Sequence, residues 1–270
     1  FMNKLNMYCL SLNNEDYKKI LTLGYNPVGL GKKYFDERWL RDNSGENISH
    51  KNEYYGEYSF HYWLWKNKIA ELNDNEWIGF CAYRRFWNSD QAVSEIKNKE
   101  DFLSTVPAIW SNYETILGQE ICMDGWTTMK LLKHGLKSLI LNPKYLFKKN
   151  RNIKFHFDSF HGYGKLDLAI DLLDEEDRED FRKFVNSNNC YNRGNMFVCK
   201  SKKIITKYYE SLFTWLEKCE KIFGFSSSSY GITRIYAFLA ERYLSFWFKK
   251  HSKTLIWPIS FFNINNSEFI

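Results

Sequence analysis

Residues 56–86 read GEYSFHYWLWKNKIAELNDNEWIGFCAYRRF, and this stretch decides the fold. It predicts an aromatic helix over Tyr54–Ala70, a short connector and a buried strand over Trp77–Tyr83. Arg84 and Arg85 follow that strand directly. In open α/β sheets ligands bind beyond the carboxyl ends of the strands, and a planar guanidinium suits phosphate oxygens. The stretch therefore predicts a phosphate-binding site, with an arginine pair held by nearby carboxylates as the alternative.

The segments on both sides continue the alternation of strands and helices. Asn6–Leu12 and Tyr25–Gly31 are predicted strands, and a helix begins between them near Asn14, followed by a turn-rich loop over residues 32–52. Further helices are predicted at Glu95–Leu103, Thr128–Leu141, Leu166–Val185, Lys202–Phe223 and Ile232–Lys249. The remaining predicted elements are an extended segment within Ala108–Leu117, a strand-to-loop stretch at Phe155–Gly164 and a buried strand at Asn192–Lys200. This order predicts one α/β domain over residues 1–270, with a mixed, mainly parallel sheet flanked by helices.

Composition narrows the class of protein. The chain has 270 residues, of which 44% are hydrophobic and 26% charged, so it is globular and not disordered. Its net charge of +6 favours an anionic ligand or a membrane surface, without the dense basic stripe of a duplex-binding protein. Aromatic residues make up 19%, and we expect most of them to be core while some stack on sugars or bases.

The cysteines indicate a reducing compartment. All six are scattered without a CxxC pair, which predicts reduced, mostly buried thiols and no structural zinc site. No secretory signal and no apolar run long enough to span a bilayer is evident. We therefore expect a cytoplasmic protein, at the inner face of the membrane if it contacts lipid.

Six blocks together resemble a bacterial family of uncharacterised domains that occurs in capsular and surface-polysaccharide loci and is regarded as glycosyltransferases. The blocks are RDNSGENISHKNEYYGE (41–57), FHYWLWKN (60–67), WIGFCAYRRFW (77–87), HFDSFHGYG (156–164), NMFVCK (195–200) and FLAERYLSFWF (238–248). The family often has His-Tyr-Arg-Arg at the strand end, where this chain has Ala82 before Tyr83. Because this chain lacks the histidine, we expect the two arginines to be the functional residues of the motif.

The resemblance implies a single GT-A-like, Rossmann-like domain that transfers a hexosyl group. The donor would be a nucleotide-diphosphate sugar, a UDP-sugar first of all, and the acceptor a glycan or lipid-linked glycan of the bacterial surface. GT-A enzymes usually carry a metal-binding Asp-x-Asp at this strand end, whereas this chain offers Tyr83, Arg84 and Arg85. We therefore expect no metal cofactor, with Mn²⁺ or Mg²⁺ held by other carboxylates, such as Asp124 or Asp158, as the alternative.

Donor-binding roles fall mainly on the loop after the second strand, and Arg84 and Arg85 are assigned a catalytic role. Asp42 and Asn47 are assigned to the ribose or base, and Lys51 and Asn52 lie beside them; turn formation by this polar loop is the alternative. Further donor contacts are assigned to Lys66 on the aromatic helix as a phosphate contact, Tyr83 as a hydrogen-bond donor and Asn195 at the donor sugar. Arg84 and Arg85 would neutralise the leaving diphosphate.

Catalytic and acceptor roles fall on the second half of the chain. Asp158 is the candidate general base, with a structural cap of the HGYG turn as the alternative. His161 and the pair Glu241 and Arg242 are candidate acceptor contacts, against a helical salt bridge. Tyr243–Lys250 combines aromatics with a basic end, so a peripheral membrane contact competes here with a buried helix.

Two other functions remain open from the sequence. A nucleotidyl- or phospho-group transferase would also use arginines at a strand end. A noncatalytic carbohydrate-binding protein would use the tryptophans and ignore the nucleotide. The chain has no GxxxxGK[ST] motif, which argues against a P-loop kinase or ATPase. No nucleic-acid partner is expected.

Overall fold

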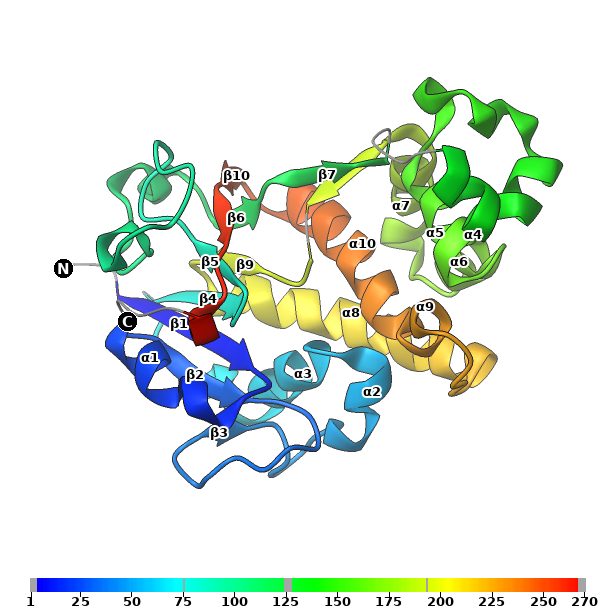
Figure 1. Cartoon of the computed structure of the whole chain (residues 1–270). Helices are drawn as coiled ribbons and strands as arrows, with labels where there is room; N and C mark the ends of the chain where they lie inside the picture. Colours follow the sequence, from blue (N-terminus) through cyan, green and yellow to red (C-terminus); the bar gives the residue numbers. More distant parts are fainter. Residues whose placement is uncertain (1–3, 75, 124–127, 193, 267–270) are drawn as a thin grey trace. The chain divides into compact units, whose positions relative to one another are not determined.

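The computed structural model describes residues 4–74, 76–123, 128–192 and 194–266 (Figure 1). The chain packs as two compact units. Unit 1 comprises residues 1–119, 194–210 and 248–270, and unit 2 comprises residues 120–193 and 211–247. Two long helices, α8 and α10, contribute residues to both. The prediction of one domain over residues 1–270 stays a prediction.

Unit 1 is built on a mixed sheet with the strand order β10-β6-β9-β4-β1-β2-β3, and β5 pairs with β4 and β11. The strands are β1 (Leu5–Ser11), β2 (Asn26–Gly29), β3 (Leu40–Arg41), β4 (Trp77–Ala82), β5 (Arg85–Trp87), β6 (Thr115–Gly118), β9 (Phe197–Cys199), β10 (Thr254–Trp257) and β11 (Ile259–Phe261). β4, β1, β2 and β3 run parallel, whereas β9 is antiparallel to both β4 and β6. The predicted mixed, mainly parallel sheet with flanking helices is confirmed.

The central strands are buried on both faces. β1 is buried from Met7 onward and β4 from Trp77 to Cys81, as expected of parallel strands covered by helices. Helices α1 (Tyr17–Thr22), α2 (Asn52–Tyr55) and α3 (Tyr58–Asn67) belong to the same unit. The ring of Phe60 lies 5.5 Å from that of Tyr8, and the ring of His61 lies 4.1 Å from that of Phe80. The aromatic stretch of α3 is therefore core, as the composition predicts for most such residues.

The predicted aromatic helix over Tyr54–Ala70 is wrong in one respect, because it is two helices. Gly56 separates α2 from α3 with φ 56° and ψ −134°, a backbone conformation that only glycine adopts readily. Lys68 ends α3, and a 3-10 turn over Ile69–Glu71 follows. Periodicity alone does not detect a single glycine break inside an aromatic run.

Unit 2 is mainly helical. It contains α4 (Thr128–Leu141), α5 (Ile153–His161), α6 (Lys165–Asp171), α7 (Glu175–Ser187) and α9 (Tyr230–Thr233), together with parts of α8 (Lys202–Phe223) and α10 (Ile235–His251). Strands β7 (Glu120–Cys122) and β8 (Cys190–Asn192) form an antiparallel ribbon. The predicted helix at Lys202–Phe223 agrees with α8 residue for residue. α4 has the predicted bounds Thr128–Leu141, but Gly135 interrupts it with a non-helical backbone, φ −115° and ψ 16°.

Three predicted elements are wrong. Phe155–Gly164 is helical up to His161, because the Asn152 side chain caps α5 by accepting from the Phe155 backbone N–H at 2.8 Å. Glu95–Leu103 contains a single 3-10 turn, Lys99–Asp101, closed by an Asn98 capping box. The strand predicted over Asn192–Lys200 divides into the end of β8 and the separate β9.

The prediction of six reduced cysteines is also wrong. Cys122 and Cys190 lie opposite each other in the β7–β8 ribbon and form a disulfide, with their Cα atoms 4.1 Å apart. Their separation of 68 residues hides the pairing from sequence spacing. Cys9, Cys81, Cys199 and Cys219 are buried free thiols, as expected.

Removing the disulfide is expected to lower the free energy of unfolding of unit 2. A crosslink that closes a long loop reduces the entropy of the unfolded chain, and its loss costs about 2–4 kcal/mol. Urea unfolding of the double variant Cys122→Ser/Cys190→Ser, compared with the oxidised protein, measures the effect. The oxidised protein treated with dithiothreitol should lose the same amount, while the variant should not respond; equal stabilities would contradict the assignment.

Candidate functional site

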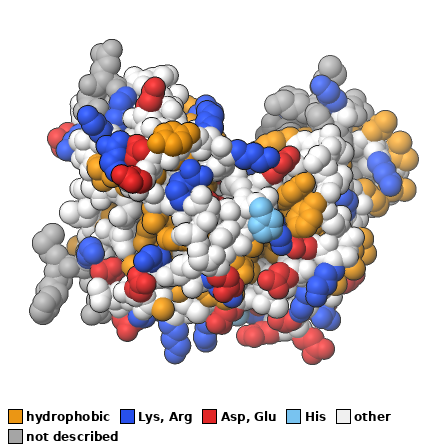
Figure 2. All heavy atoms as spheres, turned by 90° about the horizontal axis from the view of Figure 1, so that it is seen from below, with side chains coloured by type: hydrophobic (Ala, Val, Ile, Leu, Met, Phe, Trp, Pro, Cys, Tyr) orange, Lys and Arg blue, Asp and Glu red, His pale blue; other side chains and the backbone are white. Residues whose placement is uncertain are grey.

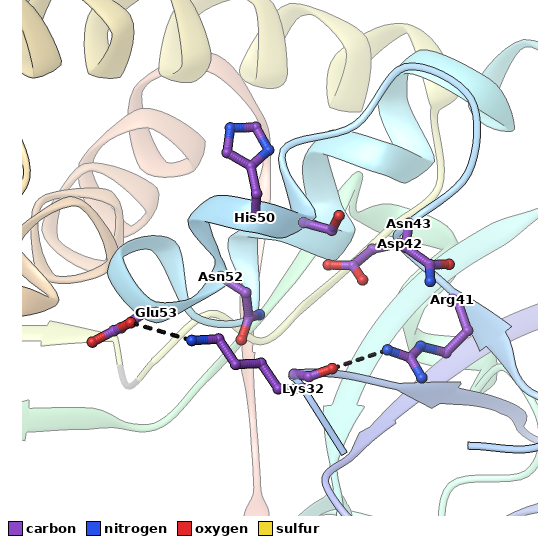
Figure 3. Close-up of a pocket in the computed structure, with 9 residues that line it drawn as sticks. Lys32, Arg41, Asp42, Asn43, His50, Asn52 and Glu53 are labelled. Carbon is purple, nitrogen blue, oxygen red and sulfur yellow. Dashed lines mark hydrogen bonds and ion pairs between the residues drawn. The ribbon is translucent and has the colours of Figure 1, made fainter. Parts of the chain in front are cut away.

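One edge of the unit 1 sheet gathers polar residues next to a pocket. β1, β2 and β3 are parallel, so their carboxyl ends meet there, as do the ends of β1 and β4. The pocket has a volume of about 650 Å³ and lies beyond β2 and β3 (Figure 3). Its lining residues are Gly31, Lys32, Arg41, Asp42, Asn43, Ser49, His50, Asn52 and Glu53.

Arg41 is the cation best placed to hold an anion in this pocket. One of its terminal nitrogens, Nη2, donates to the Gly31 carbonyl at 2.9 Å, and its guanidinium carbon lies 4.8 Å from the centre of the Phe35 ring. Its Nε is buried and has no hydrogen-bond partner. Among the described residues, no carboxylate forms an ion pair with Arg41. An oriented guanidinium with unused donors suits a phosphate.

Across the pocket, Lys32 and Glu53 form a loose pair, with Nζ and Oε2 3.8 Å apart (Figure 3). The Lys32 side chain is 94% exposed, so this contact contributes little to stability and a ligand can displace it. The pocket therefore offers a second, movable cation opposite the fixed one.

Asp42 forms the polar wall of the pocket through a short chain of hydrogen bonds. Its Oδ2 accepts from the Ser59 hydroxyl at 2.5 Å, and that hydroxyl accepts from the Asn52 amide nitrogen at 2.8 Å. The same amide nitrogen donates to the Gly56 carbonyl at 2.9 Å. Burial raises the pKa of Asp42, although the Ser59 hydroxyl opposes the shift. A buried, hydrogen-bonded carboxyl of this kind can accept from a ribose hydroxyl or a base N–H.

The other loop residues assigned to the donor have partners in the loop itself. Asn47 accepts from the backbone and hydroxyl of Ser49 and donates to the Gly45 carbonyl, which is turn formation. Lys51 ends the 3-10 turn Ser49–Lys51 and does not line the pocket. The donor-binding roles of Asn47 and Lys51 stay predictions.

Lys66, on α3, contacts the same loop through an ion pair with Glu46. Its Nζ lies 3.2 Å from a carboxylate oxygen of Glu46 and 4.0 Å from the centre of the Trp65 ring. Glu46 also accepts from the Tyr62 hydroxyl, and these two contacts lower the pKa of Glu46, the Tyr62 hydrogen bond more than Lys66. A phosphate contact by Lys66 would have to replace this ion pair, so that role stays a prediction.

Arg84 occupies a tight turn and Arg85 begins the next strand. β4 ends at Ala82, which pairs with Arg85, so Tyr83 and Arg84 form the two-residue turn of a β4–β5 hairpin. Both arginines are exposed. The guanidinium carbon of Arg84 lies 4.9 Å from the centre of the Tyr83 ring. Neither arginine lines the pocket.

Strand register relates this turn to the pocket. The Tyr83 N–H donates to the Leu10 carbonyl and the Leu30 N–H to the Ser11 carbonyl, so the two segments flank the end of β1. Two strand spacings separate them, roughly 10 Å. Asn195 lies in a turn just before β9, the strand that pairs with β4, so its role at the donor sugar stays a prediction. The Tyr83–Arg84 turn and the pocket share one edge of the sheet.

Asp158 belongs to unit 2, on α5, and both of its oxygens are engaged. Oδ2 lies 2.5 Å from the Lys154 Nζ, and Oδ1 accepts from the Gly164 backbone N–H at 3.1 Å. Burial raises the pKa of Asp158, and Lys154 opposes the shift. The contact with Gly164 is what a structural cap of the turn requires, so this arrangement favours the structural alternative. A role as general base stays a prediction.

His161, Glu241 and Arg242 also belong to unit 2, where Arg242 is 1% exposed. Its Nη2 donates to His156 Nδ1 at 3.1 Å and to His161 Nε2 at 3.3 Å. A guanidinium can only donate, so both imidazoles accept and are neutral. His161 then carries its proton on Nδ1, which donates to the Gly231 carbonyl at 3.1 Å. Burial, and then Arg242, hold the pKa values of both histidines well below the ordinary value.

Glu241 lies beside this buried cluster, with Oε2 3.3 Å from Arg242 Nη1. Contact with an acceptor would require the cluster to open, so the acceptor-binding roles of His161, Glu241 and Arg242 stay predictions. The stretch Tyr243–Phe248 that follows on α10 is buried. That result matches the buried-helix alternative for this segment.

The described residues contain no group of three or more His, Cys, Asp or Glu side chains suited to a metal ion. Asp124 lies outside the described part of the chain, and metal independence stays a prediction. The described helices include none that is long and apolar enough to cross a membrane.

Sequence reasoning missed Lys32, Arg41, His50 and Glu53 as pocket residues. Lys32 follows the predicted strand Tyr25–Gly31, so the rule that pointed to Arg84 also applied to Lys32. Arg41 is the second residue of β3, a strand of two residues that no pattern of periodicity can detect.

Together the mixed sheet and the pocket at its carboxyl edge define an α/β protein of GT-A-like fold. The chain belongs to the family described as "Domain of unknown function (DUF4422)", which matches residues 12–252. The predicted family resemblance and fold class are thereby confirmed.

Comparison with solved structures shows the same fold in the bifunctional glycosyltransferase WbbM, solved in its apo form. The TM-score is 0.71 at 21% identity, covering 96% of this chain and 45% of that one. The chain thus spans less than half the length of WbbM. The mannosyltransferase Ktr4p from S. cerevisiae matches at a TM-score of 0.34 and 10% identity, covering 91% of this chain and 67% of that one. The comparison with curated proteins gives no match.

Proposed function

We propose that this protein is a glycosyltransferase that moves a hexosyl group from a nucleotide-diphosphate donor to a glycan or lipid-linked glycan acceptor. Bacterial capsule or surface-polysaccharide synthesis is the process it would serve. The observation that carries the proposal is the pocket at the carboxyl edge, where the buried Nε of Arg41 has no hydrogen-bond partner and Arg41 forms no ion pair among the described residues. Its position in a GT-A-like fold supports a nucleotide as the occupant.

In this proposal the nucleoside lies in the pocket, against Asp42 and Asn52. The diphosphate extends from Arg41 along the sheet edge toward the Tyr83–Arg84 turn, and Asn195 reaches the donor sugar. Cationic side chains, not a metal, then stabilise the charge that develops as the diphosphate leaves. UDP-sugars are the donors we expect first.

Binding measurements separate this proposal from a sugar-binding protein. UDP and UDP-sugars at a hundred times their Kd should stabilise the protein by about 2.7 kcal/mol, seen as a rise in Tm, whereas the sugars alone should not. A response to sugars without nucleotide would favour the carbohydrate-binding alternative. Transfer of a nucleotidyl or phosphoryl group instead of a sugar, detected by mass spectrometry of the products, would favour the other transferase.

Replacing Arg41 by glutamine is expected to weaken UDP binding by about tenfold or more, because hydrogen bonds to a charged group contribute about 1.5–3 kcal/mol. The effect on uridine should be small, since uridine lacks the phosphates. Calorimetric titration of both ligands measures the difference. The matched control is Arg38→Gln, because Arg38 is an exposed arginine paired with Asp36. Equal losses for UDP and uridine would place the arginine away from the phosphates.

Transfer is expected to survive saturating EDTA. The strand end that carries Asp-x-Asp in related folds offers two guanidinium groups here, and these would repel a divalent cation. Added Mn²⁺ or Mg²⁺ should change kcat by less than twofold in a transfer assay. An enzyme that EDTA inactivates and Mn²⁺ restores would show that carboxylates hold a catalytic metal.

A further inference from the structure

The positive charge of the chain is concentrated in one segment of unit 2, residues 125–157. Residues 125–157 contain seven lysines, one arginine and no acidic residue, a local charge of +8. The whole chain carries +6, so the remaining residues sum to 6 − 8 = −2. The basic residues are Lys130, Lys133, Lys137, Lys144, Lys148, Lys149, Arg151 and Lys154. By contrast, the face of the molecule in Figure 2 shows acidic and basic side chains interspersed.

The same segment exposes large apolar side chains. Five of them, each more than half exposed, lie within twelve residues: Leu136, Ile140, Leu141, Leu146 and Phe147. On the second half of α4 they share the outward face with Lys137, whereas Ser138 and Leu139 are buried. We call residues 136–149 the basic apolar surface. Exposed apolar side chains gathered in this way mark an interaction site more often than scattered ones do.

Packing and hydrogen bonds hold the backbone that carries these side chains. α4 packs on α5, and Tyr145 stacks on Phe155 with ring centres 4.3 Å apart. Arg151 is buried and donates through Nε to the Tyr145 carbonyl at 3.1 Å and through Nη2 to the Leu146 carbonyl at 3.4 Å. Tyr145 therefore anchors the turn while Leu146 and Phe147, which follow it, stay exposed.

The lysines of this surface have no acidic partners among the described residues. Lys137, Lys144, Lys148 and Lys149 are all exposed. The contacts recorded for them are with aromatic rings: Lys137 lies 5.2 Å from the centre of Tyr163 and Lys144 5.1 Å from that of Tyr145. A cationic rim without carboxylates matches a partner that carries dense negative charge.

We propose that the basic apolar surface docks on an anionic lipid bilayer. Leu146, Phe147 and the outward leucine and isoleucine side chains of α4 would enter the boundary between headgroups and acyl chains, and the lysines would contact the headgroups. Nucleic acid would use the lysines and leave the apolar side chains in water, so lipid explains more of the surface. None of residues 136–149 lines the pocket, so lipid docking by this surface does not depend on sugar transfer.

Vesicle flotation tests the surface directly. The protein should bind vesicles of 70% phosphatidylcholine and 30% phosphatidylglycerol and bind pure phosphatidylcholine far more weakly. Phe147→Gln should reduce binding at least tenfold. Lys148→Gln/Lys149→Gln should reduce it by about twenty-five-fold, since each lysine near an anionic surface contributes about fivefold, or about 1 kcal/mol. Binding should also fall as salt rises.

Two matched variants control for changes in surface composition. Ile222→Gln removes an apolar side chain that is 59% exposed on α8, and Lys203→Gln/Lys207→Gln removes two exposed lysines from the same helix. Both should bind vesicles as the unaltered protein does. No binding to anionic vesicles, or equal losses in the control variants, would overturn the proposal. Light scattering adds a further outcome: if Phe147→Gln converts an oligomer into a monomer without any vesicle binding, the surface is a protein interface and the lipid proposal is wrong.

Discussion

Replacing Arg84 by alanine is expected to lower kcat for sugar transfer by about 10²–10³-fold. In the proposed mechanism its guanidinium stabilises the charge that develops on the leaving diphosphate, and an oriented donor of this kind contributes around 3 kcal/mol to the transition state. The two-residue turn between β4 and β5 fixes the position of Arg84 through paired backbone on both sides. Because the contribution grows as the bond breaks, the affinity for the intact UDP-sugar should fall much less than kcat does.

The companion variants sharpen this test. Arg85→Ala should also lose activity if both guanidinium groups act, and Arg84→Lys should recover part of the loss because it keeps the charge but not the planar fork. Arg182→Ala, which removes an arginine paired with Asp171 in unit 2, is the control. Near-normal turnover in both Arg84→Ala and Arg85→Ala would show that these arginines have no catalytic role. That conclusion would hold whether or not the pocket binds UDP.

Acidification below pH 6.5 is expected to destabilise the protein steeply. His61 is fully buried beside the Tyr209 hydroxyl, and burial lowers its pKa to about 3. The unfolded chain takes up this proton near pH 6.5 but the folded chain does not. The contribution of neutral His61 to stability is therefore complete above pH 6.5 and is lost as the pH falls toward 3. The loss is about 1.4 kcal/mol for each pH unit.

His156 and His161 should add to this dependence in the same direction, since burial, and then Arg242, lower their pKa values and keep them neutral. Asp42 and Asp158 oppose it, because their raised pKa values make protonation easier in the folded state. Urea unfolding at pH 7.5, 6.0 and 5.0 gives the slope. His61→Gln should flatten it, and His50→Gln, an exposed substitution, should not. An identical slope in His61→Gln would mean that other groups govern acid unfolding.

The sequence predicts what depends on periodicity and length. β1, β4 and α8 agree closely with prediction because each is a long segment with one dominant pattern. α5 was mistaken for a strand-to-loop stretch because its phenylalanines also alternate with polar residues. The residue that marks this segment as a helix is Asn152, the N-cap of α5, whose side chain accepts from the Phe155 backbone N–H three residues later.

The candidate site was harder to predict because it depends on contacts between distant residues. Asp42 and Asn52 were found from the polar loop, and they do line the pocket. Arg41 could not be singled out, because its role depends on Gly31, Phe35 and a two-residue strand coming together. The disulfide between Cys122 and Cys190 escaped prediction for the same reason.

The glycine break between α2 and α3 has a consequence for redesigning specificity. The Gly56 carbonyl accepts from Asn52, Asn52 donates to the Ser59 hydroxyl, and that hydroxyl donates to Asp42. A continuous chain of hydrogen bonds therefore joins the helix break to the inner wall of the pocket. Exchanging any of these four residues would remove a partner of another. If the pocket holds the donor, as proposed, libraries aimed at new donors should leave that wall intact and vary Lys32, Asn43 and His50, which are exposed.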